Sequence, residues 1–363
     1  MNILIFLIIL LVLVLVHEFG HFFTAKKFGI RVDEFGFGFP PKLFGKKYGE
    51  TEYSLNALPF GGFVKIFGEN PDDESLSGPD AGRSFINKPK WKQAIVLFAG
   101  IFANFLLAWL LFSFGLMSGL PTSVGNFSKY TLEDVHLMII SVTPDSPADK
   151  VGLKSGDKIV FIKSGELSTT YISPETVRSF IVGSSGQTIE MQYLRGEDSG
   201  TVLVTPEMSK NDGKPMIGIA MDQIGIAKLP VLAAFGEGLK LTLSVTKGTV
   251  MGLYTLIADS LRGQGSFESV TGPVGLVGIV GDAYRFGFVY LMSFTALISV
   301  NLAIINLVPF PALDGGRLLF LLIEKIKGSR INIKFANTVN MIGFAILIIL
   351  MLAVTYHDVV KLF

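Results

Sequence analysis

The sequence predicts an α-helical polytopic membrane protein with about four transmembrane helices, a membrane-associated β-hairpin or sheet, and an inserted β-rich extracytoplasmic domain. Three observations predict this class. Half of the 363 residues are hydrophobic and only 17% are charged, whereas soluble domains are usually about one-quarter charged. The mean hydropathy is +0.53. The apolar residues gather in long runs, and a more polar stretch with alternating apolar residues separates them.

The charge and cysteine content exclude several classes of protein. The 31 Lys and Arg residues nearly balance the 30 Asp and Glu residues, so we expect no nucleic-acid partner. The chain has no cysteine, which excludes a disulfide framework, an iron–sulfur cluster and a thiolate zinc site. The composition also argues against a disordered chain and a soluble enzyme.

The first predicted span covers residues 1–25. Residues 3–16 are uninterrupted Ile, Leu, Phe and Val. A cleaved signal peptide is the alternative, but no Lys or Arg precedes the run and no small-residue cleavage site follows it. Because Lys26 and Lys27 follow the run, we expect this end of the span on the cytoplasmic side and the N-terminus outside.

Three further spans are expected at residues 93–118, 285–309 and 335–357. With four spans, the Lys- and Arg-rich segments 26–92 and 310–334 both lie on the cytoplasmic side. This agrees with the rule that short cytoplasmic loops are enriched in basic residues, and it supports the count.

Residues 230–282 are expected to hold an amphipathic, interfacial helix and a Gly-Pro loop. Leu232 and Leu239 belong to a helical pattern of apolar residues, which Glu237 interrupts. We therefore favour a helix on the outer membrane surface. A fifth span over 231–260 is the alternative, and it would invert the orientation of everything after it.

Residues 126–225 are expected to form the extracytoplasmic domain. Four stretches alternate like strands and one is typical of a short helix: Leu137–Val142, Lys158–Lys163, Thr188–Leu194, Thr201–Val204 and Thr176–Ile181. With the turn at Ser146-Pro147-Ala148, this order resembles a PDZ domain of the bacterial protease-associated type. A generic small β-rich domain is the alternative.

Residues 32–67 also show strand patterns, although they lie between two spans. Phe35, Phe37 and Phe39 alternate with glycines, and Leu58–Gly62 has the composition of a turn. A sheet cannot expose its edges to lipid. We expect this one to lie at the interface, against the helices, or along a wet cavity.

The first span contains His17-Glu18-Phe19-Gly20-His21, an H-E-x-x-H motif. On a helix both imidazoles project from nearly the same face, where they can bind zinc, and Glu18 can act as general base on a water activated by the metal. Ionisable groups inside a membrane each cost about 2.5–3.5 kcal/mol. At 1.5 Å per residue, His17 lies about 24 Å into a hydrocarbon core of about 30 Å, nearer the cytoplasmic face. Snorkelling of these groups at the interface is the alternative.

Asp314 is the best candidate for a third ligand. It follows the third span, at the same depth as His17, whereas the other two histidines are expected on the outer side. Pro309 and Pro311 end the helix before it, and irregular backbone at this depth must be buried or face a cavity. The alternative is that Asp314 only N-caps a helix over Arg317–Ile326.

These motifs together resemble the site-2 proteases, and more closely the bacterial regulator-of-sigma-E protease branch with a single PDZ domain. The resemblance covers nearly the whole chain. The segments that carry it are His17–His21, Phe35–Gly38, Pro59–Val64, Ala99-Gly100 with Asn104, Thr271–Gly275 and Asn306–Gly315. Two features depart from the family pattern: residues 121–225 have room for one PDZ domain where some relatives have two, and Ile101 follows Gly100 where the family usually has Pro.

The resemblance implies one Zn²⁺ per chain, bound by His17, His21 and Asp314, with Glu18 as the catalytic base. It implies that Gly61–Ile66 is an edge strand that pairs with an unwound substrate. The implied substrate-binding residues are Gly61, Gly62, Phe63, Val64, Asn306 and Pro311. Asn306 has a second interpretation as a bond between helices, and Asn104 is interpreted as packing or interhelical hydrogen bonding.

The expected function is an intramembrane zinc endopeptidase that cuts transmembrane helices of single-pass proteins, of the anti-sigma factor or remnant signal peptide type, in regulated intramembrane proteolysis. We expect a multi-pass protein of the bacterial inner membrane, with its active site toward the cytoplasm. The PDZ-like domain would contact peptides or ectodomains outside and reject untrimmed substrates. The alternatives are a membrane-anchored protease acting in water and a non-enzymatic scaffold that binds C-terminal peptides.

Overall fold

The structure is a computed structural model that describes residues 1–363 apart from 128, 185, 197, 210–212, 264–270 and 361–363. The chain divides into two compact units. Met1–Gly115 and Leu232–Phe363 form the first unit, and Leu116–Val231 form the second. The second unit is therefore an insertion that extends beyond the expected range 126–225 at both ends.

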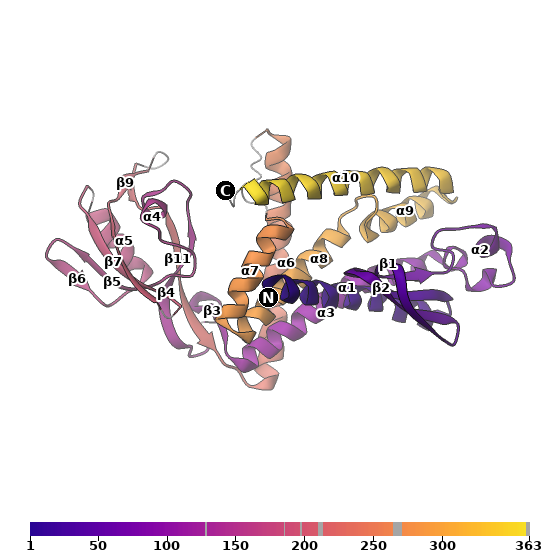
Figure 1. Cartoon of the computed structure of the whole chain (residues 1–363), viewed down its shortest axis with the longest axis horizontal. Coiled ribbons are helices and arrows are strands. Elements are labelled where there is room, and N and C mark those ends of the chain that lie inside the picture. The colour runs from indigo at the N-terminus through magenta and orange to yellow at the C-terminus, as the bar shows by residue number, and fades with distance from the viewer. Residues whose placement is uncertain (128, 185, 197, 210–212, 264–270, 361–363) are drawn as a thin grey trace. The chain divides into compact units, whose positions relative to one another are not determined.

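Long helices dominate the first unit (Figure 1), and several of them are strongly apolar. Its helices are α1 (Asn2–Lys27), α2 (Asp73–Ser77), η1 (Ala81–Arg83), η2 (Phe85–Asn87), α3 (Lys90–Ser118), α6 (Val231–Leu261), α7 (Pro273–Phe286), α8 (Phe288–Leu307), α9 (Asp314–Lys327) and α10 (Ile333–Val360). The four expected spans correspond to α1, α3, α8 and α10. Each is apolar on all sides over most of its length, as expected of helices that face lipid or other helices.

Close packing joins α1 to its neighbours. Ile9 and Leu13 of α1 form a buried cluster with Val280 of α7. One helical turn beyond His17, a Cβ at Gly20 would lie 2.3 Å from the backbone oxygen of Ala99 in α3. Helix association in a membrane depends on such close contacts because lipid is as apolar as the side chains. A small residue at this position therefore allows α3 to approach α1 closely.

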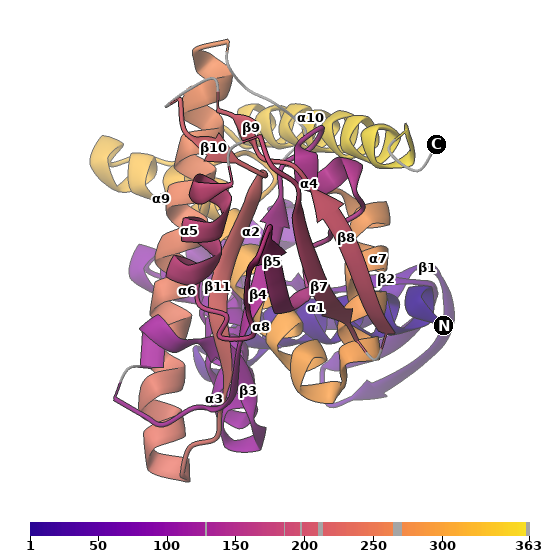
Figure 2. The same cartoon turned by 90° about the vertical axis from the view of Figure 1, so that its left-hand side faces the viewer.

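α6 differs from the other long helices in its direction. Within the described residues, five helices are long and apolar enough to cross a membrane, and α6 is one of them. In both views, however, α6 runs across the axis of α10 rather than alongside it (Figures 1 and 2). Two helices oriented in this way do not both follow the membrane normal.

The Gly-Pro loop expected within residues 230–282 is shorter than expected, because Thr271 and Gly272 lie outside helices but α7 begins at Pro273. Pro273 occupies the first helical position, where its missing N–H costs nothing. The buried carboxylate of Asp358 accepts hydrogen bonds from the N–H groups of Gly272 (3.1 Å) and Gly275 (2.8 Å). This contact from α10 pairs N–H groups that have no partner within α7 at its N-terminus. Residues 264–270 of the expected loop lie outside the described part.

The strands expected over residues 32–67 are confirmed. β1 (Val32–Tyr48) and β2 (Thr51–Ile66) pair with one another. Residues 34–37 of β1 pair with 52–55 on one side, with the residue numbers rising together, and antiparallel with 62–65 on the other side. Residues 62–65 therefore form an edge of the sheet. This edge lies against α1, since a Cβ at Gly62 would be 3.4 Å from Leu15.

The second unit is β-rich, as the alternating patterns predict. Three of the four expected strand stretches lie within a strand, and the fourth, Thr188–Leu194, begins one residue before β7. Its elements are β3 (Leu120–Ser123), η3 (Val124–Phe127), β4 (Glu133–Val142), α4 (Pro147–Lys150), β5 (Lys158–Ser164), β6 (Leu167–Thr169), α5 (Pro174–Gly183), β7 (Ile189–Arg195), β8 (Asp198–Val204), β9 (Glu207–Met208), β10 (Pro215–Met216) and β11 (Ile219–Ala227). The main sheet has the order β3-β11-β4-β5-β7-β8, with β6 on β5.

The core of this unit explains its strand pattern. Alternate residues of β4, β5 and β7, such as Ile139, Ile162 and Ile189, are fully buried and pack with Val177 of α5. Burying each such side chain contributes about 1.5–3 kcal/mol. Ser173 caps α5 by accepting a hydrogen bond from the Thr176 N–H, which fixes where the helix begins.

Candidate metal centre

His17 and His21 lie on one buried face of α1. Their exposed fractions are 7% and 6%, and they continue the buried stripe formed by Ile9 and Leu13. The two rings meet edge to face, and their Nε2 atoms are 3.1 Å apart. The spacing of four residues thus places both imidazoles together, as the sequence predicts.

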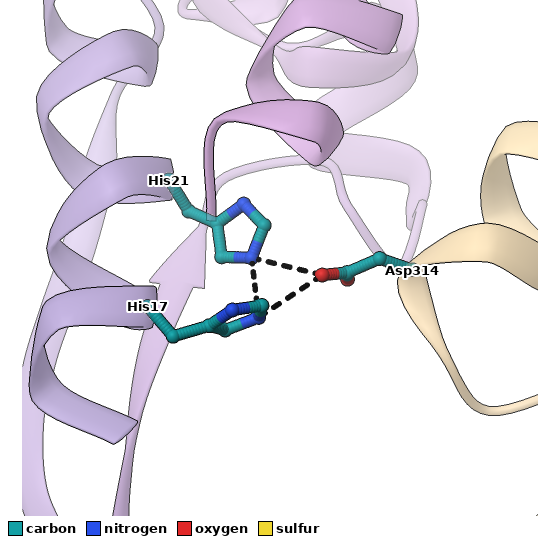
Figure 3. A group of neighbouring side chains, drawn as sticks. All are labelled: His17, His21 and Asp314. Atoms are coloured by element: carbon teal, nitrogen blue, oxygen red, sulfur yellow. Dashed lines mark hydrogen bonds and ion pairs between the residues drawn. The ribbon is translucent and has the colours of Figure 1, made fainter. Parts of the chain in front are cut away.

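Asp314 approaches the two histidines from a different element (Figure 3). Its Oδ2 lies 3.0 Å from His17 Nε2 and 3.2 Å from His21 Nε2. Burial acts to raise the pKa of the Asp314 carboxyl, but the neighbouring His17 and His21 imidazoles outweigh burial and hold the pKa below its ordinary value. The alternative role of Asp314 as an N-cap is wrong. The N-cap of α9 is Leu313, and Asp314 is the first helical residue.

A tight turn between α8 and α9 delivers Asp314 to the site. A Cβ at Gly315 would lie 2.3 Å from the backbone oxygens of Leu307 and Val308, and one at Gly316 would lie 2.2 Å from that of Phe310. Any side chain at either position would collide with backbone that cannot rotate away. The two glycines of the Asp-Gly-Gly sequence are thus required because α9 begins directly against the turn.

The three side chains fit a zinc ion. Two neutral imidazoles and one carboxylate are ligands that zinc accepts, and a fourth position remains for water in catalytic sites. Bond lengths of about 2.0–2.1 Å and tetrahedral angles place neighbouring ligand atoms about 3.3 Å apart. The three observed separations, between 3.0 and 3.2 Å, are close to that value.

Helix α3 supports the two histidines from behind. His21 Nδ1 lies 2.8 Å from the Val96 carbonyl oxygen, which accepts its hydrogen bond. Gly100 lies directly beneath the rings, since a Cβ there would be 2.3 Å from His21 Nε2 and 2.9 Å from His17 Cε1. Such contacts orient metal ligands and select their tautomer. Nothing in the sequence signals the Val96 contact, because any residue presents a backbone carbonyl.

Glu18 lies on the side of α1 that faces the β-sheet. Its Oε2 accepts a hydrogen bond of 3.0 Å from the backbone N–H of Val64. Val64 pairs with Phe35 in the sheet, so this N–H belongs to the outer edge of residues 62–65. The sheet edge and the glutamate of the H-E-x-x-H motif are therefore in direct contact.

The remaining residues predicted at the site are placed as follows. Gly62, Phe63 and Val64 pair with β1, and Gly61 has a positive φ of 95° that suits glycine. Asn306 is partly buried in the last turn of α8.

Pro311 packs against α10, because a Cβ at Gly343 would lie 2.5 Å from Pro311 Cβ. This contact shows that Pro311 has a packing role, whether or not it also contacts substrate. The substrate-binding roles of these residues remain predictions.

A candidate metal-binding triad with two members on a long apolar helix is the kind of site expected of a membrane metalloenzyme. Comparison with known proteins identifies the family. The model of peptidase family M50 matches residues 5–350. The chain therefore belongs to peptidase family M50, the site-2 proteases, and it is a zinc metalloendopeptidase.

Several relatives carry protease names. A Clostridium perfringens protein named as a zinc metalloprotease is 37% identical over 349 residues, which cover 96% of this chain and 95% of the relative. The regulator of sigma-W protease RasP of Bacillus subtilis is 30% identical over 434 residues. The match covers 99% of this chain and 98% of the relative. Among solved structures, the PDZ domain of an SdrC-like protein from Listeria monocytogenes covers 24% of this chain and 86% of that domain, with 24% identity and a TM-score of 0.21.

Proposed function

We propose that this chain is an intramembrane zinc endopeptidase that hydrolyses peptide bonds within transmembrane helices of single-pass substrates. The observation that carries the proposal is the convergence of His17, His21 and Asp314 on one buried point beside α1. α1 is long and apolar enough to span a membrane. Titratable groups in such a helix are costly and are typically functional.

Within the proposed site, His17, His21 and Asp314 hold the zinc ion and Glu18 is the general base. A zinc ion held by these residues would supply Lewis-acid chemistry, lowering the pKa of water to about 7 and polarising a peptide carbonyl. Glu18 takes a proton from the attacking water and passes it to the leaving amine. Before substrate binds, the Val64 N–H orients the Glu18 carboxylate.

The sheet edge at Gly61, Gly62, Phe63 and Val64 is proposed to receive the substrate. A transmembrane helix keeps its peptide carbonyls in internal hydrogen bonds, so it must unwind locally before it can be cut. Pairing with an edge strand replaces the lost backbone hydrogen bonds. The contact between Val64 and Glu18 supports this assignment, because a strand added to this edge lies beside the base. Asn306 and Pro311 are proposed to line the substrate path.

The proposed topology has four spans, α1, α3, α8 and α10, with α6 on the outer surface. The Lys- and Arg-rich segments then lie in the cytoplasm, and the active site lies toward that side of a bacterial inner membrane. The inserted second unit lies outside and acts as a PDZ-like domain. The order of its strands and the helix α5 support this assignment.

The proposed substrates are anti-sigma factors or remnant signal peptides in regulated intramembrane proteolysis. The name of the Bacillus subtilis relative, a regulator of sigma-W protease, supports the first class. The external unit is proposed to reject substrates whose ectodomains have not been trimmed.

The variant Glu18→Gln tests the proposal. We expect the purified variant to retain one zinc per chain and to cut a model transmembrane helix about 10²–10⁴-fold more slowly, because the base is lost while the three ligands remain. Glu166→Gln, at an exposed position of the second unit, is the matched control and should cut normally. Cleavage by Glu18→Gln at the parental rate would show that the mechanism is wrong.

A further inference from the structure

Asn104 is the buried polar side chain of α3 that lies nearest to the proposed metal site. It is fully buried, and its Nδ2 lies 3.4 Å from His17 Nδ1. Its Oδ1 has no hydrogen-bond partner among the described residues. A buried amide oxygen without a partner costs about 1–3 kcal/mol, so this arrangement requires an explanation.

The tautomer of His17 supplies the explanation. His17 Nε2 faces Asp314 and His21, and a neutral imidazole that binds a cation through Nε2 carries its proton on Nδ1. An Nδ1–H is a donor, whereas the NH₂ group of Asn104 is also a donor. The two groups do not match while the amide presents its nitrogen.

A half-turn of the Asn104 amide exchanges its two ends, which have nearly the same shape. The oxygen then faces His17 Nδ1 and the NH₂ group takes its former place. This single rotation gives the Nδ1–H an acceptor and gives Oδ1 a partner. The contact copies that of His21, whose Nδ1 donates to the Val96 carbonyl at 2.8 Å.

We infer that Asn104 is a positioning residue for the metal site: its Oδ1 accepts a hydrogen bond from His17 Nδ1–H and so fixes the tautomer that presents Nε2 to zinc. The inference rests on the proposed function, because it takes His17 as a zinc ligand. Helix α3 then orients both histidines, one through a side chain and one through its backbone. Packing alone does not explain why the buried residue at position 104 is an amide.

The test compares variants of Asn104 by their affinity for zinc, measured by competition with a chelator of known affinity. Asn104→Leu keeps the volume but removes the acceptor, and we expect its zinc dissociation constant to rise about 10- to 100-fold. Asn104→Asp keeps an acceptor at the same place and should bind zinc at least as tightly as the parent. The thermal unfolding of the zinc-free proteins reports whether each variant folds.

Ser299→Ala is the matched control. The Ser299 hydroxyl donates to the backbone oxygen of Asn104 at 2.8 Å, so this variant loses a hydrogen bond between α3 and α8 but keeps the side-chain acceptor. Its zinc affinity should equal that of the parent. If Asn104→Leu does not fold, Asn104→Ala replaces it in the comparison with Asn104→Asp.

The inference is overturned if the variant without an acceptor binds zinc as tightly as the parent, or if Asn104→Asp binds as weakly as that variant. Failure of the proposed function is a separate result. In that case His17→Ala would bind as much zinc as the parent, whereas under the proposed function it loses the metal whatever Asn104 does.

Discussion

Replacement of Gly100 by Ala should disrupt the metal centre without removing any ligand. The added Cβ would lie 2.3 Å from His21 Nε2, 2.6 Å from its Cε1 and 2.9 Å from His17 Cε1. Carbon atoms in contact are ordinarily about 3.5–4.0 Å apart, so the His21 ring must move by about 1 Å. That movement also strains its hydrogen bond to the Val96 carbonyl.

The expected magnitude follows from the displacement. A shift of about 1 Å in a catalytic group can cost about 100-fold in rate, and loss of a supporting contact weakens metal binding about 10- to 100-fold. We therefore expect Gly100→Ala to bind zinc about 10- to 100-fold more weakly and to cleave about 100-fold more slowly than the parent. Zinc affinity by chelator competition and cleavage of a model transmembrane helix measure the two effects.

Gly278→Ala is the matched control. Gly278 also lies within a helix, α7, but a Cβ there meets nothing within 4 Å. Since alanine is the better helix former by about 0.5–1 kcal/mol, this variant should be as stable as the parent or slightly more so. The reasoning is refuted if Gly100→Ala binds zinc and cuts the helix like Gly278→Ala.

Three further predictions follow from the same geometry. Gly315→Ala should abolish stoichiometric zinc binding, because its Cβ would lie 2.3 Å from two backbone oxygens of the turn that delivers Asp314; full zinc content in metal analysis would contradict this. Asp358→Asn should lower the free energy of unfolding by about 1–3 kcal/mol, since an NH₂ group then faces one of two N–H donors of α7; a thermal or denaturant melt measures the change, and an unaltered melt counts against the capping contact. Residues 117–228 can be replaced by a short Gly-Ser linker, because the ends of the unit already meet where the Leu229 N–H donates to the Leu116 oxygen at 2.8 Å. This variant should still cleave substrates and should also accept untrimmed ones. Unchanged selectivity in a cleavage assay would refute the role of the unit as a filter.

Much of the fold could be predicted because the relevant signals are local. An uninterrupted apolar run specifies a span, and strict alternation specifies a half-buried strand. The H-E-x-x-H motif places two ligands on one face through helix geometry alone. The segment α6 shows the limit of such signals. Its length and hydropathy permit a span, whereas Glu237 within its apolar pattern favours a surface position, so the local signals disagree.

The contacts between distant segments could not be predicted in the same way. Val96, Asn104 and Val64 each contact a residue of the H-E-x-x-H motif. Two of these contacts use backbone atoms, which every residue type offers, so the sequence carries no mark of them. The family resemblance drew attention to Asn104, but it did not indicate that Asn104 contacts His17. The helical start of α7 was likewise missed, because the side chain that caps it comes from α10.

The sequence by itself determined the long apolar helices, the β-rich insertion, and the pair of histidines with a glutamate between them, because periodicity and spacing along one element fix these features. The tertiary structure alone decided that Asp314 reaches those histidines through a turn that tolerates no side chain at Gly315 or Gly316. It also decided that α3 lies close enough to orient both rings. These outcomes depend on how closely separate helices approach, and that distance is set by packing across the whole unit rather than by any local pattern.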